Sequence, residues 1–147
     1  MPSPSYFPVA PNRLSYAEVN ADFPVTGTTV QTATPLAAAV EAGRTYTMWA
    51  SVIFSNTSAA ATAGLSWTGP AGATMQWINT TGTSNYRASI GLVDPYTGSV
   101  AARMALLSGR LVVPTTAGSL TLTLSTSDGA QTSTLLSGSW IYLARVI

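Results

Sequence analysis

The side chains that could do chemistry are few, and their types exclude most enzyme mechanisms. The chain has no His, Cys or Lys, and its only charged residues are six Arg and five Asp or Glu among 147 residues. Without imidazole or thiolate there is no Ser-His or Cys-His nucleophile pair and no soft ligand set for zinc, copper or iron. Without Lys there is neither a Schiff base nor a P-loop. We therefore expect no catalytic residue, no cofactor and no metal site.

Two carboxylates remain as candidates for catalysis. Asp94 and Asp128 could form a glycosidase pair, because two carboxylates that flank a sugar suffice for hydrolysis. Each lies beside a turn residue, Pro95 or Gly129, where Asp is favoured because its side chain bonds the local backbone. The turn interpretation is preferred. The acids also lack the close spacing that several oxygen ligands of calcium would need.

Aromatic side chains offer a second kind of site, a stacking platform for a sugar. The candidates are Trp49, Trp67, Trp77, Tyr86, Tyr96 and Trp140. Core packing is the commoner fate of a Trp in a strand, so it is the preferred interpretation, and binding of host-surface glycans stays an alternative.

The composition predicts a surface made of hydroxyls and apolar groups instead of ions. Only 7% of the residues are charged and 46% are hydrophobic, against about 25% charged in an average soluble domain. A net charge of +1 provides no field to attract nucleic acid, so DNA and RNA are not expected partners. Mean hydropathy is high at +0.28, yet no window of 18 apolar residues predicts a membrane span. Residues 1–12 lack the features of a secretory signal. We expect the apolar surface to be covered by copies of the chain itself.

Residues 1–25 are expected to form an extended N-terminal arm. Five prolines in this segment disfavour helix interiors and central strands. The segment is nevertheless too apolar for an inert linker. It either packs along its own domain as an irregular first strand or docks on a neighbour or a larger assembly. The candidate anchors for docking are Tyr6, Phe7, Arg13 and Tyr16.

Residues 26–147 are expected to form one all-β domain. Period-2, β-branched segments alternate with turn residues, and we predict strands at 28–36, 45–54, 61–68, 74–79, 85–93, 103–107, 109–114, 119–125, 132–136 and 139–146. The Ala-rich segment 36–43 is expected to form at most one helical turn, and residues 95–98 are predicted to form a turn. Leu120, Leu122 and Leu124 share one face of their strand, opposite hydroxyls expected to be solvated. This pattern favours an antiparallel two-sheet sandwich of Greek-key or jelly-roll type.

Two strands carry apolar residues on both faces, which predicts that each is covered twice. In the last strand Trp140 and Tyr142 oppose Ile141 and Leu143, and in 46–54 Met48, Val52 and Phe54 oppose Trp49 and Ile53. Because the core covers only one face of each strand, we expect a second subunit to cover the other face. Candidate interface residues are Trp49, Ile53, Ile141, Leu143, Arg145 and Ile147, and which face forms the interface is left open. Arg145 lies either at the oligomer axis with a carboxylate or carbonyl partner or at a solvent rim.

Two stretches resemble small structural proteins and fibre-tip domains of tailed bacteriophages, especially those that infect actinobacteria. They are residues 64–77 (GLSWTGPAGATMQW) and the closing stretch that contains TAGSLTL at 116–122 and LSGSWIYL at 136–143. The resemblance covers about residues 26–147. It implies a jelly roll similar to tumour necrosis factor that assembles as a homotrimer, and it transfers no catalytic residue.

The resemblance implies a capsid decoration protein, also called a cement protein or head fibre. Such a protein would bind the major capsid protein on the outer surface of the virion, with residues 1–25 as the anchoring arm. A tail fibre normally has a long shaft, so the short arm favours the capsid. A tail-fibre or baseplate tip that binds host glycans is the alternative, and an unrelated secreted or enzymatic sandwich is the third hypothesis.

Overall fold

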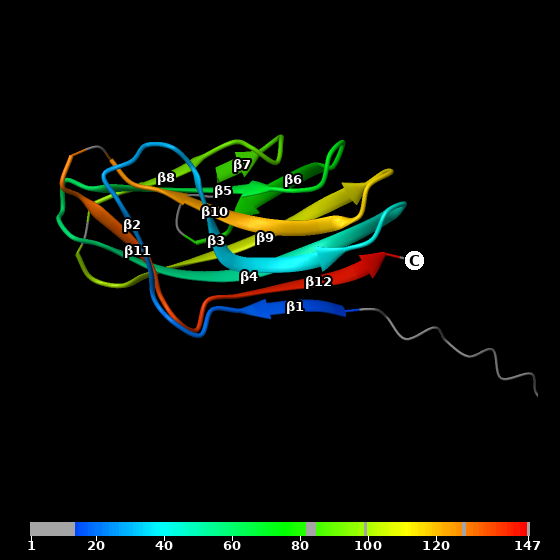
Figure 1. Ribbon diagram of the computed structural model, residues 1–147, viewed down its shortest axis with the longest axis horizontal. Helices are drawn as coiled ribbons and strands as arrows, with labels where there is room; N and C mark the ends of the chain where they lie inside the picture. The colour runs from blue at the N-terminus through cyan, green and yellow to red at the C-terminus, as the bar shows by residue number, and fades with distance from the viewer. Residues whose placement is uncertain (1–13, 82–84, 99, 128, 147) are drawn as a thin grey trace, which may run out of the picture.

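A computed structural model describes residues 14–81, 85–98, 100–127 and 129–146. Within these ranges the chain forms twelve β-strands and no helix (Figure 1). The strands are β1 (Leu14–Glu18), β2 (Phe23–Thr26), β3 (Thr32–Val40), β4 (Arg44–Asn56), β5 (Thr62–Thr68), β6 (Thr74–Asn79), β7 (Asn85–Arg87), β8 (Asp94–Thr97), β9 (Arg103–Val113), β10 (Gly118–Ser125), β11 (Thr132–Leu135) and β12 (Trp140–Val146).

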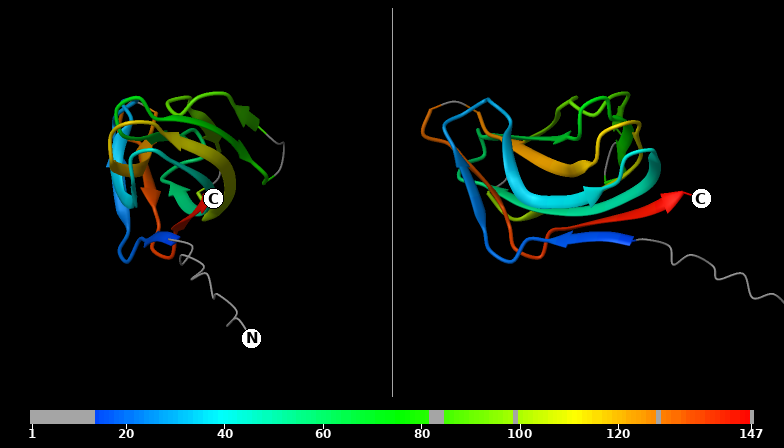
Figure 2. Two further views of the ribbon diagram at one scale, coloured as in Figure 1. Left: turned by 90° about the vertical axis from the view of Figure 1, so that its right-hand side faces the viewer. Right: turned by 45° about the vertical axis from the view of Figure 1, so that its right-hand side comes forward.

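The strands form two antiparallel sheets that pack face to face (Figures 1 and 2). The large sheet has the order β1-β12-β4-β9-β6-β7, and β11 extends it by pairing with both β4 and β2. The small sheet has the order β3-β10-β5-β8. The predicted all-β, antiparallel two-sheet sandwich of jelly-roll type is confirmed.

The core lies between the sheets and follows the period-2 pattern of the sequence. Leu120, Leu122 and Leu124 of β10 are fully buried, as predicted, and they face the buried Met48 and Phe54 side of the large sheet. The expected solvated face of β10 is only partly solvated, because the amide of Gln31 bonds the hydroxyls of Thr123 and Ser125 at 2.9 and 2.7 Å. A loop therefore covers part of this outer face.

The Ala-rich segment forms a strand, and the single helical turn that the sequence allowed at most is not present over Leu36–Val40. Leu36, Ala38 and Val40 are buried in alternation with exposed residues along β3, which shows a period of two. Tertiary pairing with β10 outweighs the helix propensity of Ala. Pro35 is tolerated because β3 is an edge strand and needs hydrogen bonds on one side only.

Other strand boundaries also differ from the sequence prediction. The predicted turn at 95–98 is mostly strand β8, whose Pro95 again lies on an edge. The two predicted strands at 103–107 and 109–114 are one strand, β9. Gly109 does not interrupt it: a Cβ there would lie 2.6 Å from the Gln76 carbonyl oxygen, so the close approach of β6 requires glycine.

Residues 14–26 belong to the sandwich, which differs from the expected arm boundary at residue 25. Strand β1 pairs with β12 over five residues, and β2 pairs with β11 over four. Both are outermost strands, which suits a segment that contains Pro24. Any free arm is thereby limited to residues 1–13, which lie outside the described residues.

A buried polar cluster joins the two sheets at the end where β6, β7 and β8 meet. The carboxylate of Asp94 is fully buried and accepts hydrogen bonds from Arg87 Nη2 at 2.5 Å, Asn85 Nδ2 at 3.2 Å and Asn79 Nδ2 at 3.3 Å. Asn79 also donates to the hydroxyl of Tyr96. The interpretation of Asp94 as a local turn residue is therefore wrong, because its partners come from another sheet and a buried ion pair needs several hydrogen bonds to offset its desolvation.

Replacement of Asp94 by Asn should be strongly destabilising, because Arg87 would keep a largely buried charge without its counter-ion. We expect the free energy of unfolding to fall by about 3 kcal/mol, measured by urea denaturation. The control is Glu41→Gln, which removes the exposed carboxylate that lies 3.7 Å from Arg44 and 3.8 Å from Arg145. Its cost should stay below about 1 kcal/mol. Equal costs for both variants would refute a structural role for the buried pair.

Tyr96 should make the fold sensitive to alkaline pH. Burial raises the pKa of Tyr96 far above its usual value, and its hydrogen bond with Asp94 adds to the shift. The unfolded chain then releases this proton near pH 10 while the folded chain keeps it, so stability is full below about pH 10 and falls as pH rises. The slope is at most about 1.4 kcal/mol per pH unit. Urea denaturation across this range should show a shallower decline for Tyr96→Phe, and parallel curves would contradict the assignment.

Candidate functional site

An aromatic group lies on the face of the large sheet that points away from the core. The register places Tyr16 of β1 opposite Tyr142 of β12, and Tyr142 opposite Trp49 of β4. The rings of Trp49 and Tyr142 are 5.7 Å apart and tilted by 48°. Together with Trp140 these side chains line a shallow depression of about 460 Å³. Tyr16 is 56% exposed and Trp49 is 43% exposed, which is high for such large apolar groups.

The apolar surface continues from the depression across β4 and β9. Ile53 pairs with Met104, and Leu106 lies one outward position further along β9. Met104 and Leu106 are 50% and 41% exposed. We call the whole surface the outer apolar face, and its members are Leu14, Tyr16, Trp49, Ile53, Met104, Leu106, Trp140 and Tyr142. Contiguous exposed apolar surface of this kind marks an interaction site in most proteins.

The predicted interface residues divide between this face and the core. Trp49 and Ile53 lie on the outer apolar face. Ile141 and Leu143 are fully buried in the core of their own chain, so they cannot contact a second subunit. The alternating neighbours Trp140 and Tyr142, named in the sequence only as the opposite face of the strand, lie on the outer apolar face instead. The signal was present, because the two pairs alternate along one strand, but the pattern alone does not tell which pair points into the core.

The remaining predicted interface residues lie apart from the face. Arg145 lies near one end of the sandwich, where its Nη1 atom is 3.8 Å from Glu41 Oε2 and Arg44 approaches the same carboxylate at 3.7 Å. Arg145 therefore has a carboxylate partner, but in its own chain. Ile147 lies outside the described residues.

One of the four predicted arm anchors is placed by the structure. Tyr16 belongs to β1 and to the outer apolar face, and its hydroxyl donates to Glu18 Oε2 at 2.9 Å. This hydrogen bond raises the pKa of Tyr16. Tyr6, Phe7 and Arg13 lie outside the described residues.

The six candidate sugar-stacking aromatics do not form one platform. Trp67 and Trp77 are buried in the core, and Trp77 Nε1 donates to the carbonyl of Ser89 at 3.2 Å. Tyr96 belongs to the polar cluster and packs edge-on against Phe54. Of these six, only Trp49 and Trp140 line the depression. Tyr86 is exposed on β7, at the opposite end of the strand order from β1.

The carboxylates considered for catalysis are placed only in part. Asp94 is enclosed by its partners in the polar cluster, and Asp128 lies outside the described residues. Within the described ranges, no three Asp or Glu side chains gather in a way that could hold a metal ion. In the same ranges no helix has the length and hydropathy to cross a membrane.

Comparisons with known proteins give structural neighbours only. No protein-family description and no curated protein matches the chain. Among solved structures, the chain is similar to a protein in the structure of the infectious bursal disease virus Gx strain, with 14% identity, a TM-score of 0.31, and coverage of 90% of this chain and 40% of that one. It is also similar to the VP2 subviral particle of infectious bursal disease virus, with 12% identity, a TM-score of 0.29, and coverage of 99% and 44%. These neighbours are viral capsid proteins, and this chain spans less than half of their length.

Proposed function

We propose that this chain is a virion structural protein, a decoration protein that binds the outer surface of a capsid lattice as a homotrimer and stabilises it. The observation that carries the proposal is the outer apolar face on a sandwich with almost no charged residues. The resemblance of residues 64–77 and 116–143 to structural proteins of tailed bacteriophages adds the setting, the major capsid protein as partner and the trimeric state.

The outer apolar face accounts for self-association in energetic terms. Burial of a few hundred Å² of apolar surface per subunit stabilises an assembly by several kcal/mol, at about 25 cal/mol/Å² before association costs. Trp49, Ile53, Trp140 and Tyr142 are the contact residues under this proposal. Their large rings and aliphatic groups have the chemistry that dominates stable interfaces.

The function is mechanical. A trimer at a local threefold position would tie neighbouring capsid subunits together against the pressure of packaged DNA. Residues 1–13, with Tyr6, Phe7 and Arg13, would contact the shell. Because so few charges take part, binding would depend weakly on salt concentration.

One observation favours a second candidate function. The depression lined by Tyr16, Trp49, Trp140 and Tyr142 is open and aromatic, which suits a tail-fibre or baseplate tip that stacks on host-surface sugars. The two functions use the same surface in opposite ways: decoration covers it with protein, whereas sugar binding leaves it open.

Substitution of the outer apolar face should separate the subunits without unfolding them. Trp49→Asp places a charge in the proposed interface, so sedimentation velocity should show a shift from trimer to monomer. The dissociation constant of the trimer should rise at least about 100-fold. Ala37→Asp adds the same charge at an exposed position of β3, on the other sheet, and should leave the trimer intact. A Trp49→Asp protein that remains trimeric would show that this face is not the interface.

Deletion of residues 1–13 should abolish capsid binding and leave a folded trimer, because strands β1 and β2 are kept. Binding is measured by co-sedimentation of the variant with undecorated particles. Deletion of residues 1–25 is the contrasting variant, and it should unfold the chain because it removes β1 and all of β2 except Thr26. Decoration by the chain that lacks residues 1–13 would contradict the anchoring role.

The copy number of the chain in purified particles distinguishes the two candidate functions. Quantitative mass spectrometry should find a fixed ratio to the major capsid protein that matches one class of lattice position. A handful of copies per particle would instead support the tail-tip function, and glycan binding would then be tested with Trp140→Ala.

A further inference from the structure

The outward positions of the large sheet carry only two charged side chains among the described residues. Glu18 lies on β1, at one edge, and Arg110 lies on β9, on the other side of the aromatic group. Both are exposed. The other outward positions on β1, β4, β9 and β12 are apolar or carry hydroxyls.

Glu18 and Arg110 are too far apart to pair within one chain. The register sets Glu18 level with Ser51 and Arg110 level with Thr47, and three strand spacings separate β1 from β9. With strands about 4.8 Å apart and about 3.3 Å per residue, the two backbones lie about 20 Å apart. In the described part of the chain, no carboxylate lies within ion-pair distance of Arg110.

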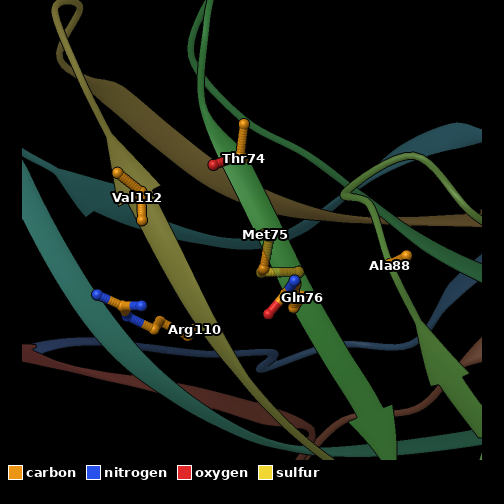
Figure 3. A pocket seen from close by; sticks show the side chains of 6 residues that line it. All are labelled: Thr74, Met75, Gln76, Ala88, Arg110 and Val112. Atoms are coloured by element: carbon orange, nitrogen blue, oxygen red, sulfur yellow. The ribbon is translucent and has the colours of Figure 1, made fainter.

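Arg110 borders a small polar cavity. The cavity has a volume of about 240 Å³ and is lined by Thr74, Met75, Gln76, Ala88, Arg110 and Val112 (Figure 3). In Figure 3 the side chain of Arg110 extends away from Gln76 and Thr74, so its exposed guanidinium does not converge with them on one ligand. The guanidinium is open to a carboxylate from outside the chain, which it can hold by a charge-assisted hydrogen bond.

The acidic group that matches Arg110 belongs to the same surface. Glu18 is the one carboxylate among the described outward positions of the large sheet, and Tyr16 holds it by a hydrogen bond of 2.9 Å. A carboxylate on the β1 side of the face and an exposed cation on the β9 side are complementary when the β1 side of one copy meets the β9 side of the next. This is a head-to-tail contact, which forms a closed ring when the rotation between neighbouring copies closes.

We propose that the β1 side of the outer apolar face binds the β9 side of the same face on a second copy of this chain, with Glu18 of each copy beside Arg110 of the next. This inference rests on the proposed homotrimer and adds its register. The aromatic group of one copy covers the contact, excludes water from the ion pair and so strengthens it. The charge pair fixes the relative position of the two subunits. Apolar contact alone would allow several relative positions.

Charge reversal tests the pairing. Glu18→Arg and Arg110→Glu each place like charges in contact, and each should weaken trimer association at least about 30-fold, measured by sedimentation equilibrium. The double variant restores opposite charges in swapped positions and should recover association to within about 10-fold of the original chain. Circular dichroism confirms that each variant is folded.

Two controls alter the net charge by the same amount away from the face. Asp22→Arg and Arg44→Glu change exposed residues that lie outside the outer apolar face, and both should leave association unchanged. A trimer that tolerates both single reversals on the face, or a double variant that fails to recover, would overturn the pairing while leaving the homotrimer in place.

Two further outcomes separate the inference from the proposed function. A wild-type chain that stays monomeric at every concentration would overturn the homotrimer and the pairing together. Binding of glucuronic acid to the wild-type trimer, lost in Arg110→Ala, would overturn the pairing alone, since Arg110 would then be open to an acidic sugar.

Discussion

The pairing of β4 with β9 over eleven consecutive residues is the constraint on which the rest of the structure depends. With β12 and β11 on its other side, β4 has partners along most of its thirteen residues, so its side chains can leave the sheet only toward the core or directly away from it. Met48, Val52 and Phe54 take the first direction, and Trp49 and Ile53 take the second. One strand thus fixes both the core and the outer apolar face.

Much of the fold follows from side-chain periodicity, because a period of two is a local property of the sequence. The alternation of leucines in β10 and the two apolar faces of β4 and β12 were readable in this way. Periodicity does not show which of the two faces of a strand points into the core. Ile141 and Leu143 are buried while Trp140 and Tyr142 are not, and only the packing of the small sheet decides between the two pairs.

The sequence prediction failed where long-range pairing outweighs local preference. Residues 36–40 are rich in Ala, yet β10 pairs with them as a strand. Residues 14–26 contain few strong strand signals, yet β12 and β11 offer them open edges. Asp94 illustrates the same limit for a polar residue: its neighbours in sequence indicate a turn, while its hydrogen-bond partners Asn79, Asn85 and Arg87 come from the opposite sheet.

A scarcity of charge gives each remaining ion more influence on structure. Apolar burial is non-directional, so an apolar interface gains free energy in many relative positions of its two halves. Directional groups have to select one of them. Inside the sandwich, Asp94 and Arg87 do this by linking β8 to β7 and so aligning one end of the two sheets. On the outer apolar face the same task falls to Glu18 and Arg110, because the hydroxyls and rings around them discriminate weakly between neighbouring registers.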